Sequence, residues 1–208
     1  MRKIDNSVLI WDLKIRLFHW ILVLGFVAAY LSARFHLGFL HTLIGYFLCF
    51  LLLARILLGF TGSQYARFNS FTFSATETIS YIRTLAKGKP RHYFGHNPAG
   101  ALMVYALLIT LTLIFISGLA TLAVIDFEGP LQFLLNHLDD NASYAIHHLH
   151  AWLIDVALVL ILLHLFGVVM GSIQHKENFV KAMFTGKKKS YQQTFSEKQC
   201  PDDCHAEN

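Results

Sequence analysis

The stretch that decides the fold is residues 146–170, IHHLHAWLIDVALVLILLHLFGVVM, which reads as an apolar helix containing two deep histidines, His150 and His164. Fourteen residues of α-helix turn through about 1400° and rise about 21 Å, so both imidazoles fall within about 40° of one face. They are therefore expected near the two edges of a hydrocarbon core about 30 Å thick. Polar side chains at such depth mark functional sites, and neutral imidazole binds iron. The stretch predicts two stacked metal centres, with haem favoured.

The composition indicates a membrane protein. Of the 208 residues, 55% are hydrophobic and 14% are charged, whereas a soluble domain carries about 25% charged residues. Four apolar runs are each long enough to cross a bilayer, at residues 17–33, 40–60, 99–125 and 144–173. Because a helix satisfies its own backbone in lipid, we predict an all-α membrane protein, a four-transmembrane-helix bundle. This domain is expected over residues 1–175, followed at 176–208 by a tail with a short surface helix and then disordered chain.

Basic residues are distributed unevenly between the connections. The N-terminal segment and the connection between the second and third spans carry several Lys and Arg residues, and the tail carries six Lys residues. Of the two outer connections, the first has Arg34 as its only basic Lys or Arg residue. The second outer connection, residues 126–143, has no Lys or Arg and is acidic. By the positive-inside rule both termini, and so the tail, are expected to be cytoplasmic, in a multi-pass protein of the bacterial inner membrane. The net charge of +4 reflects this rule, and membrane lipid rather than nucleic acid is the expected partner.

Two further histidines lie near span ends and supply partners for the first two. His19 enters the membrane from the inside on the first span, and His41 enters from the outside on the second. Since the fourth span runs inward, the topology pairs His41 with His150 and His19 with His164, each pair leaving room for a planar group between two helices. By simple counting His164 lies deeper than His19, so either the first span begins earlier, near Leu13, or the fourth extends beyond the bilayer.

Gly45 and Arg55 share the face of His41 and are candidate cofactor-binding residues. Gly45 lies four residues after His41 and would let a flat macrocycle approach the backbone, unless it only permits close helix packing. Arg55 lies fourteen residues after His41, at the inner depth. A buried arginine needs an anionic partner, which a haem propionate would supply. Snorkelling to lipid headgroups is an equal alternative.

Other metal chemistry is less well supported. A zinc or copper transporter would more often place carboxylates or sulfur beside the histidines, and Asp155 is the only acid within a span. Cys200 and Cys204 are one residue too far apart for the C-x-x-C-H haem-attachment motif. They also fall in the predicted cytoplasmic tail, where a weakly metal-binding segment is expected.

Short motifs run through the whole membrane region: Trp11-Asp12, RLFHW at 16–20, HTLIGY at 41–46, GHNP at 95–98, and His150 with His164. Together they resemble the bacterial cytochrome b561 family, which includes the b-type cytochrome subunits of nickel–iron hydrogenases. The resemblance excludes the tail. It implies a four-helix diheme cytochrome that exchanges electrons with the quinone pool. It also implies that His19, His41, His150 and His164 are the haem ligands, in agreement with the pairing from topology.

The functional hypothesis is electron transfer between quinone and a periplasmic redox partner, such as a c-type cytochrome or a redox enzyme, in a respiratory chain. The expected cofactors are two bis-histidine haems b, with quinone as an exchangeable substrate. No catalytic side chain is expected, because the cofactors carry the chemistry.

Two alternatives use the same haems. Some family members resemble superoxide oxidases, which pass electrons from superoxide to quinone. The two outer connections are acidic taken together, with only Arg34 and nearby His36 in favour, and suit that anion poorly. The other alternative is a membrane anchor for a periplasmic hydrogenase, docked through short loops. The sequence leaves the redox partner and the direction of electron flow open.

Overall fold

The computed structural model describes residues 7–64, 66–87, 93 and 97–189. Four of its helices are long and apolar enough to cross a membrane, namely α1 (Leu13–Arg34), α2 (Gly38–Thr61), α4 (Pro98–Ile125) and α6 (Asp140–His175). They coincide with the four predicted spans, so the prediction of four membrane-length helices is confirmed. The cytoplasmic position of the termini stays a prediction.

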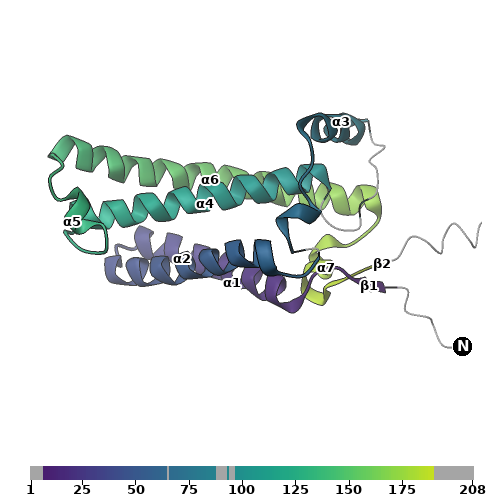
Figure 1. Cartoon of the computed structure of the whole chain (residues 1–208), viewed down its shortest axis with the longest axis horizontal. Helices are drawn as coiled ribbons and strands as arrows, with labels where there is room; N and C mark the ends of the chain where they lie inside the picture. The colour runs from purple at the N-terminus through teal and green to yellow at the C-terminus, as the bar shows by residue number, and fades with distance from the viewer. Residues whose placement is uncertain (1–6, 65, 88–92, 94–96, 190–208) are drawn as a thin grey trace, which may run out of the picture.

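The long helices form two layers (Figure 1). α1 packs along α2, α4 packs along α6, and α2 also contacts α4. A small apolar core joins the layers and consists of Ile114, Leu153, Ala157, Phe26 and Ile154. Many large apolar side chains point outward instead, such as Leu24 at 70% and Phe50 at 71% exposure. Such an exterior suits a bundle whose surroundings are lipid.

Side-chain caps fix where three of the long helices begin. Asp12, Asn97 and Asp139 each accept a hydrogen bond from the backbone amide three residues further on, at 2.9, 2.7 and 2.8 Å respectively. These caps satisfy amides that the first helical turn leaves unpaired. Pro98 suits the first position of α4 because it has no amide hydrogen to satisfy.

The two ends of the bundle differ in structure (Figure 1). At one end, which we call the α5 end, the chain between α4 and α6 includes the short helix α5 (Gln132–Leu135). The other end, which we call the terminal end, holds η1 (Phe68–Ser70) and α3 (Ala75–Ala86) between α2 and α4. Both ends of the described chain also lie there, with β1 (Ser7–Leu9), α7 (Phe179–Thr185) and β2 (Lys187–Lys189).

A short ladder ties the chain ends together and departs from the purely helical expectation. β1 and β2 pair antiparallel, and the carbonyl of Gly186 accepts hydrogen bonds from the amides of Ile10 and Trp11 at 2.8 and 3.1 Å. Just before the ladder, Phe184 stacks on Trp20 of α1 with ring centres 4.3 Å apart, and its carbonyl accepts a bond from Arg16 Nη1. The C-terminal segment is thus fastened to the first turns of α1.

The predicted tail is only partly covered by the described residues. Its surface helix is present as α7, whereas Cys200 and Cys204 lie outside the described residues. Outside the tail, the Gly95-His96 part of the GHNP motif also lies outside the described residues. The boundary after residue 175 stays a prediction.

Substitution of Gly186 is expected to release the C-terminal segment. Gly186 has a φ of +79°, and a Cβ there would lie 2.5 Å from the carbonyl oxygen of Trp11. The left-handed conformation alone costs an L-residue about 1–2 kcal/mol. Gly186→Val should therefore speed trypsin cleavage in the segment around Lys187 several-fold in detergent. Gly38→Ala is the control, because nothing lies within 4 Å of a Cβ at Gly38. Equal cleavage of both variants and the parent would show that the ladder does not hold the segment.

Candidate functional site

Two histidine pairs lie between the layers. Near the α5 end, the ring centres of His41 on α2 and His150 on α6 are 6.3 Å apart. Nearer the terminal end, those of His19 on α1 and His164 on α6 are 6.5 Å apart. The structure therefore brings together the same pairs that the topology predicted. Among the described residues α6 makes few close backbone contacts with α1 or α2, so each pair bridges helices that are themselves held apart.

The depth mismatch noted in the sequence is absent from the structure, for both of the reasons foreseen. α1 begins at Leu13, four residues before the apolar run used for counting, which places His19 deeper in the bundle. α6 has 36 residues, about 54 Å of helix, and so extends beyond a hydrocarbon core of about 30 Å.

Hydrogen bonds orient both rings of the pair near the α5 end. Nδ1 of His41 lies 2.9 Å from the carbonyl oxygen of Ala29. Nδ1 of His150 lies 3.1 Å from the carbonyl oxygen of Ile114 and 3.0 Å from Oγ of Ser117. A carbonyl only accepts, so each Nδ1 carries the proton and each Nε2 is left with a free lone pair. Metal-binding histidines are typically held in this way.

Gly118 makes room for the ring of His150. A Cβ at Gly118 would lie 3.0 Å from Cε1 of His150, so any side chain there would require the ring or α4 to shift. Ser117, the preceding residue, contacts the same ring through its hydroxyl. Ala29, Ile114 and Ser117 were not among the sequence-predicted site residues. Ala29 and Ile114 act through backbone carbonyls, which no side-chain pattern reveals. Ser117 could have been found, because it is a polar residue within an apolar span.

The environment of His19, in the pair near the terminal end, is different, because its Nδ1 has no hydrogen-bond partner among the described residues. Trp20 packs edge-on against His19, with ring centres 5.0 Å apart. Nδ1 of His19 and Nε1 of Trp20 are buried and have no hydrogen-bond partner among the described residues. An orphaned, buried polar atom is costly. These nitrogens are therefore available to a group that the protein alone does not supply.

Arg55 has a buried donor atom without a hydrogen-bond partner in the described chain, and Gly45 lies beside open space. Arg55 is 5% exposed, and its guanidinium lies over the ring of Phe68, 5.3 Å from the centroid. Its Nη1 has no hydrogen-bond partner within the part of the chain described, so this buried guanidinium can still donate to an anionic group. At Gly45 no atom lies within 4 Å of the position a Cβ would take. Open space beside a backbone is what a flat ligand needs.

Two further histidines of α6 lie away from the pairs. His147 and His148 are exposed and contact each other, with ring centres 6.2 Å apart. Neither is paired across the bundle with His19 or His41 in the contacts described.

The ring separations fit two imidazoles on opposite sides of one metal ion. An imidazole nitrogen binds a first-row metal at about 2.0 Å, and its ring centre lies roughly 1 Å further back, so the two centres are expected about 6 Å apart. The observed 6.3 and 6.5 Å agree. The donor set, the free Nε2 lone pairs and the unpaired Arg55 together fit haem with carboxylate side groups.

Comparison with known proteins decides the family. The model of the prokaryotic cytochrome b561 family matches residues 10–186. The chain belongs to this family. It is also 24% identical to a probable Ni/Fe-hydrogenase B-type cytochrome subunit of Rhizobium leguminosarum bv. viciae, over 88% of this chain and 89% of that protein. No solved structure matches the chain.

Membership confirms the resemblance drawn from the motifs and settles the broad function. This cytochrome b561 is a membrane electron-transfer protein that carries b-type haem. With its four membrane-length helices, it is a multi-pass protein of the inner membrane.

A substitution at Gly118 should disturb the haem held by His150 selectively. A larger side chain would push the imidazole away from Ser117 and Ile114, so Gly118→Val is expected to shift or abolish one low-spin ferric signal in the electron paramagnetic resonance spectrum while leaving a second intact. Gly38→Ala again serves as the control, with both signals unchanged. If Gly118→Val changes neither signal, His150 is not a haem ligand.

Proposed function

We propose that this cytochrome b561 holds two haems b, one between His41 and His150 and the other between His19 and His164. The observation that carries the proposal is the pair of ring separations, 6.3 and 6.5 Å, at two levels of one helix. A haem iron bound by two imidazoles gains and loses single electrons without changing its ligands. Two such irons, each bound by one histidine of α6, would form a path for electrons across the membrane.

The remaining predicted residues have roles in holding these groups. Arg55 would pair with a propionate of the haem at the terminal end, which explains why a buried guanidinium has an unpartnered Nη1. Gly45 would let a haem edge lie against the backbone of α2, where the structure leaves open space. Ser117 and the carbonyls of Ala29 and Ile114 would keep His41 and His150 in the tautomer that binds iron.

For the orientation, the basic connections favour a cytoplasmic terminal end, and the α5 end would then face the periplasm. Residues 1–175 would form the diheme domain and residues 176–208 the cytoplasmic tail. The haem of His41 and His150 would lie near a periplasmic partner, and the haem of His19 and His164 near the quinone on the cytoplasmic side.

The partner proposed for the α5 end is a redox protein of the periplasm. The exposed acidic residues at this end are Asp126, Glu128, Asp139 and Asp140. Such a surface steers a basic partner such as a c-type cytochrome. A hydrogenase is the second candidate partner, because the relative from Rhizobium is named as a hydrogenase cytochrome subunit. The same acids would repel superoxide, which disfavours a superoxide oxidase.

Replacing His164 tests the haem assignment. We expect a pyridine haemochrome assay to give two haems b per chain in the parent and one in His164→Ala, because the haem at the terminal end loses an axial ligand. His148→Ala is the matched control, since this histidine of the same helix is exposed, and it should retain both haems. Two haems with unchanged spectra in His164→Ala would reject the assignment.

Neutralising two acids at the α5 end tests the proposed docking surface. Reduction of a basic c-type cytochrome by the pre-reduced protein should slow several-fold in the double variant Glu128→Gln, Asp140→Asn. The parent rate should fall with ionic strength, because the Debye length shortens to about 8 Å at physiological salt. Glu77→Gln, on exposed α3 at the opposite end, is the control. Salt-independent rates that are equal in all three proteins would exclude the acidic end as the docking surface.

A further inference from the structure

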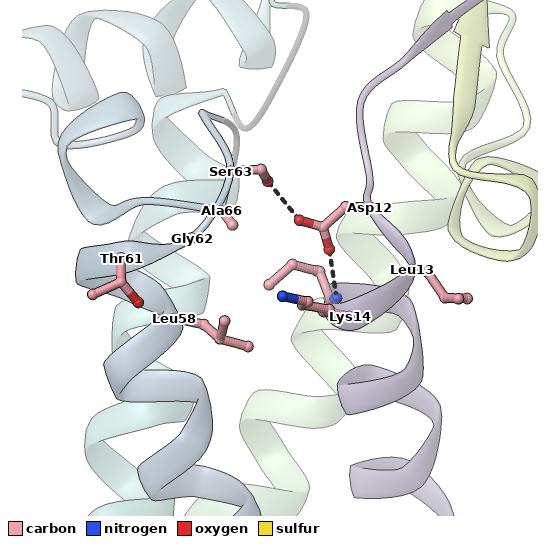
Figure 2. A pocket seen from close by; sticks show the side chains of 9 residues that line it. Asp12, Leu13, Lys14, Leu58, Thr61, Gly62, Ser63 and Ala66 are labelled. Atoms are coloured by element: carbon pink, nitrogen blue, oxygen red, sulfur yellow. Dashed lines mark hydrogen bonds between the residues drawn. The ribbon is translucent and has the colours of Figure 1, made fainter.

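A cavity of about 590 Å³ opens at the terminal end, between the first turn of α1 and the last turn of α2 (Figure 2). Its polar lining comes from Asp12, Lys14, Thr61 and Ser63, and its apolar lining includes Ile15 and Leu58. The proposed haem sites use none of these residues. A cavity with a polar rim and apolar walls suits a ring that bears oxygen atoms and continues into an apolar tail.

The carboxylate of Asp12 joins the two helices across this cavity. Its Oδ1 accepts the amide of Ile15 at 2.9 Å, and its Oδ2 accepts the hydroxyl of Ser63, just beyond α2, at 2.6 Å. Burial acts to raise the pKa of Asp12, but the hydrogen bonds from Ser63 and the backbone outweigh it and lower the pKa below its usual value. Lys14 and Arg55 add positive charge around it. Asp12 is therefore an ionised carboxylate at neutral pH, with a proton-carrying hydroxyl beside it.

The cavity lies about one helical turn along α1 from the histidine pair of the terminal end. Ile15 is four residues before His19 on α1, and Leu58 is three residues after Arg55 on α2. Four residues of helix rise about 6 Å. A group bound against Ile15 is thus about one helical turn from the backbone that carries His19.

A second hollow, of about 310 Å³ between α2 and α4, lacks these features. Its lining is mainly apolar, and the hydroxyl of Tyr105 in it already shares a hydrogen bond with Thr72 at 2.9 Å. Its described lining includes neither a carboxylate nor an amine, so it offers no group to exchange a proton.

We propose that the cavity at the terminal end binds the head group of a quinone and that Asp12 exchanges protons with it. This proposal rests on the proposed function, which makes quinone the membrane-side electron carrier. Lys14 and Thr61 would bind a ring oxygen, while the apolar walls formed by Ile15 and Leu58 would enclose the ring and the start of its tail.

The chemistry balances in either direction. When a quinol is oxidised, its two O–H bonds would break and two protons would leave, while its two electrons would pass one at a time to the haem that His19 and His164 would hold. Each proton passes to the Asp12 carboxylate and then to water at the cavity mouth, and the carboxylate is regenerated each time. Quinone reduction would be the reverse, with two protons delivered from water through Asp12 and two electrons supplied one at a time by that haem.

Binding is tested with a photoreactive azido-quinone followed by peptide mapping. In the parent we expect label on the segments that line the cavity, around residues 12–15 and 58–66. Leu58→Trp should fill the cavity and reduce this label at least tenfold. Leu57→Trp is its matched control, because Leu57 is the adjacent residue of the same helix and is 64% exposed, and it should label like the parent. Label on other segments, or equal label in both variants, overturns the proposal.

Proton exchange is tested by stopped-flow reduction of the haems with decylubiquinol. Asp12→Asn keeps an N-cap acceptor for α1 but cannot take up a proton at neutral pH. It should slow reduction by quinol at least tenfold, while reduction by dithionite and the haem content stay as in the parent. Glu77→Gln, which alters an exposed acid of α3 outside the cavity lining, should reduce at the parental rate.

The outcomes separate the two proposals. If decylubiquinol does not reduce the parent at all, the proposed exchange with quinone is wrong. If the parent is reduced but Asp12→Asn and Leu58→Trp react at the parental rate, quinone reacts elsewhere and only the assignment of this cavity fails. Loss of bound phospholipid from Leu58→Trp with unchanged quinol kinetics would make the cavity a lipid site and likewise overturn the assignment.

Discussion

The spacing of His150 and His164 on α6 is the constraint on which the rest of the structure depends. Fourteen residues return an α-helix to nearly the same face, so both imidazoles point into the bundle, each at a different depth. Each is costly in an apolar interior unless a partner engages it. α1 and α2 meet this need because they run in opposite directions and carry His19 and His41 near opposite ends. α4 supports the arrangement from behind, with Ser117 and the carbonyl of Ile114 on the ring of His150.

Much of this arrangement follows from the sequence because it depends on helix periodicity and on membrane thickness. The four spans and the partners of His150 and His164 on α6 rest on those two regularities. Counting from the apolar run alone misjudged the depth of His19, since α1 begins within the mixed segment at Leu13. A polar N-cap at Asp12 marks that start better than hydropathy does.

What the sequence could not provide are contacts made by backbone atoms or by segments far apart in the chain. The carbonyls of Ala29 and Ile114 that hold the rings have no side-chain signature. The ladder between β1 and β2 joins three-residue strands from opposite ends of the chain, and strands so short carry no readable alternation. The bond from Ser63 to Asp12 likewise links α1 to the turn after α2. These contacts gather at the terminal end, where they fix the helix that carries His19 and shape the cavity beneath it.

The central claim is that four histidines bind two irons in one bundle. Quantitative electron paramagnetic resonance of the fully oxidised, purified protein tests it most directly. The account predicts two low-spin ferric signals of bis-imidazole type that integrate to two spins per chain. A single spin per chain, or a high-spin signal from an iron with one histidine ligand, would contradict it.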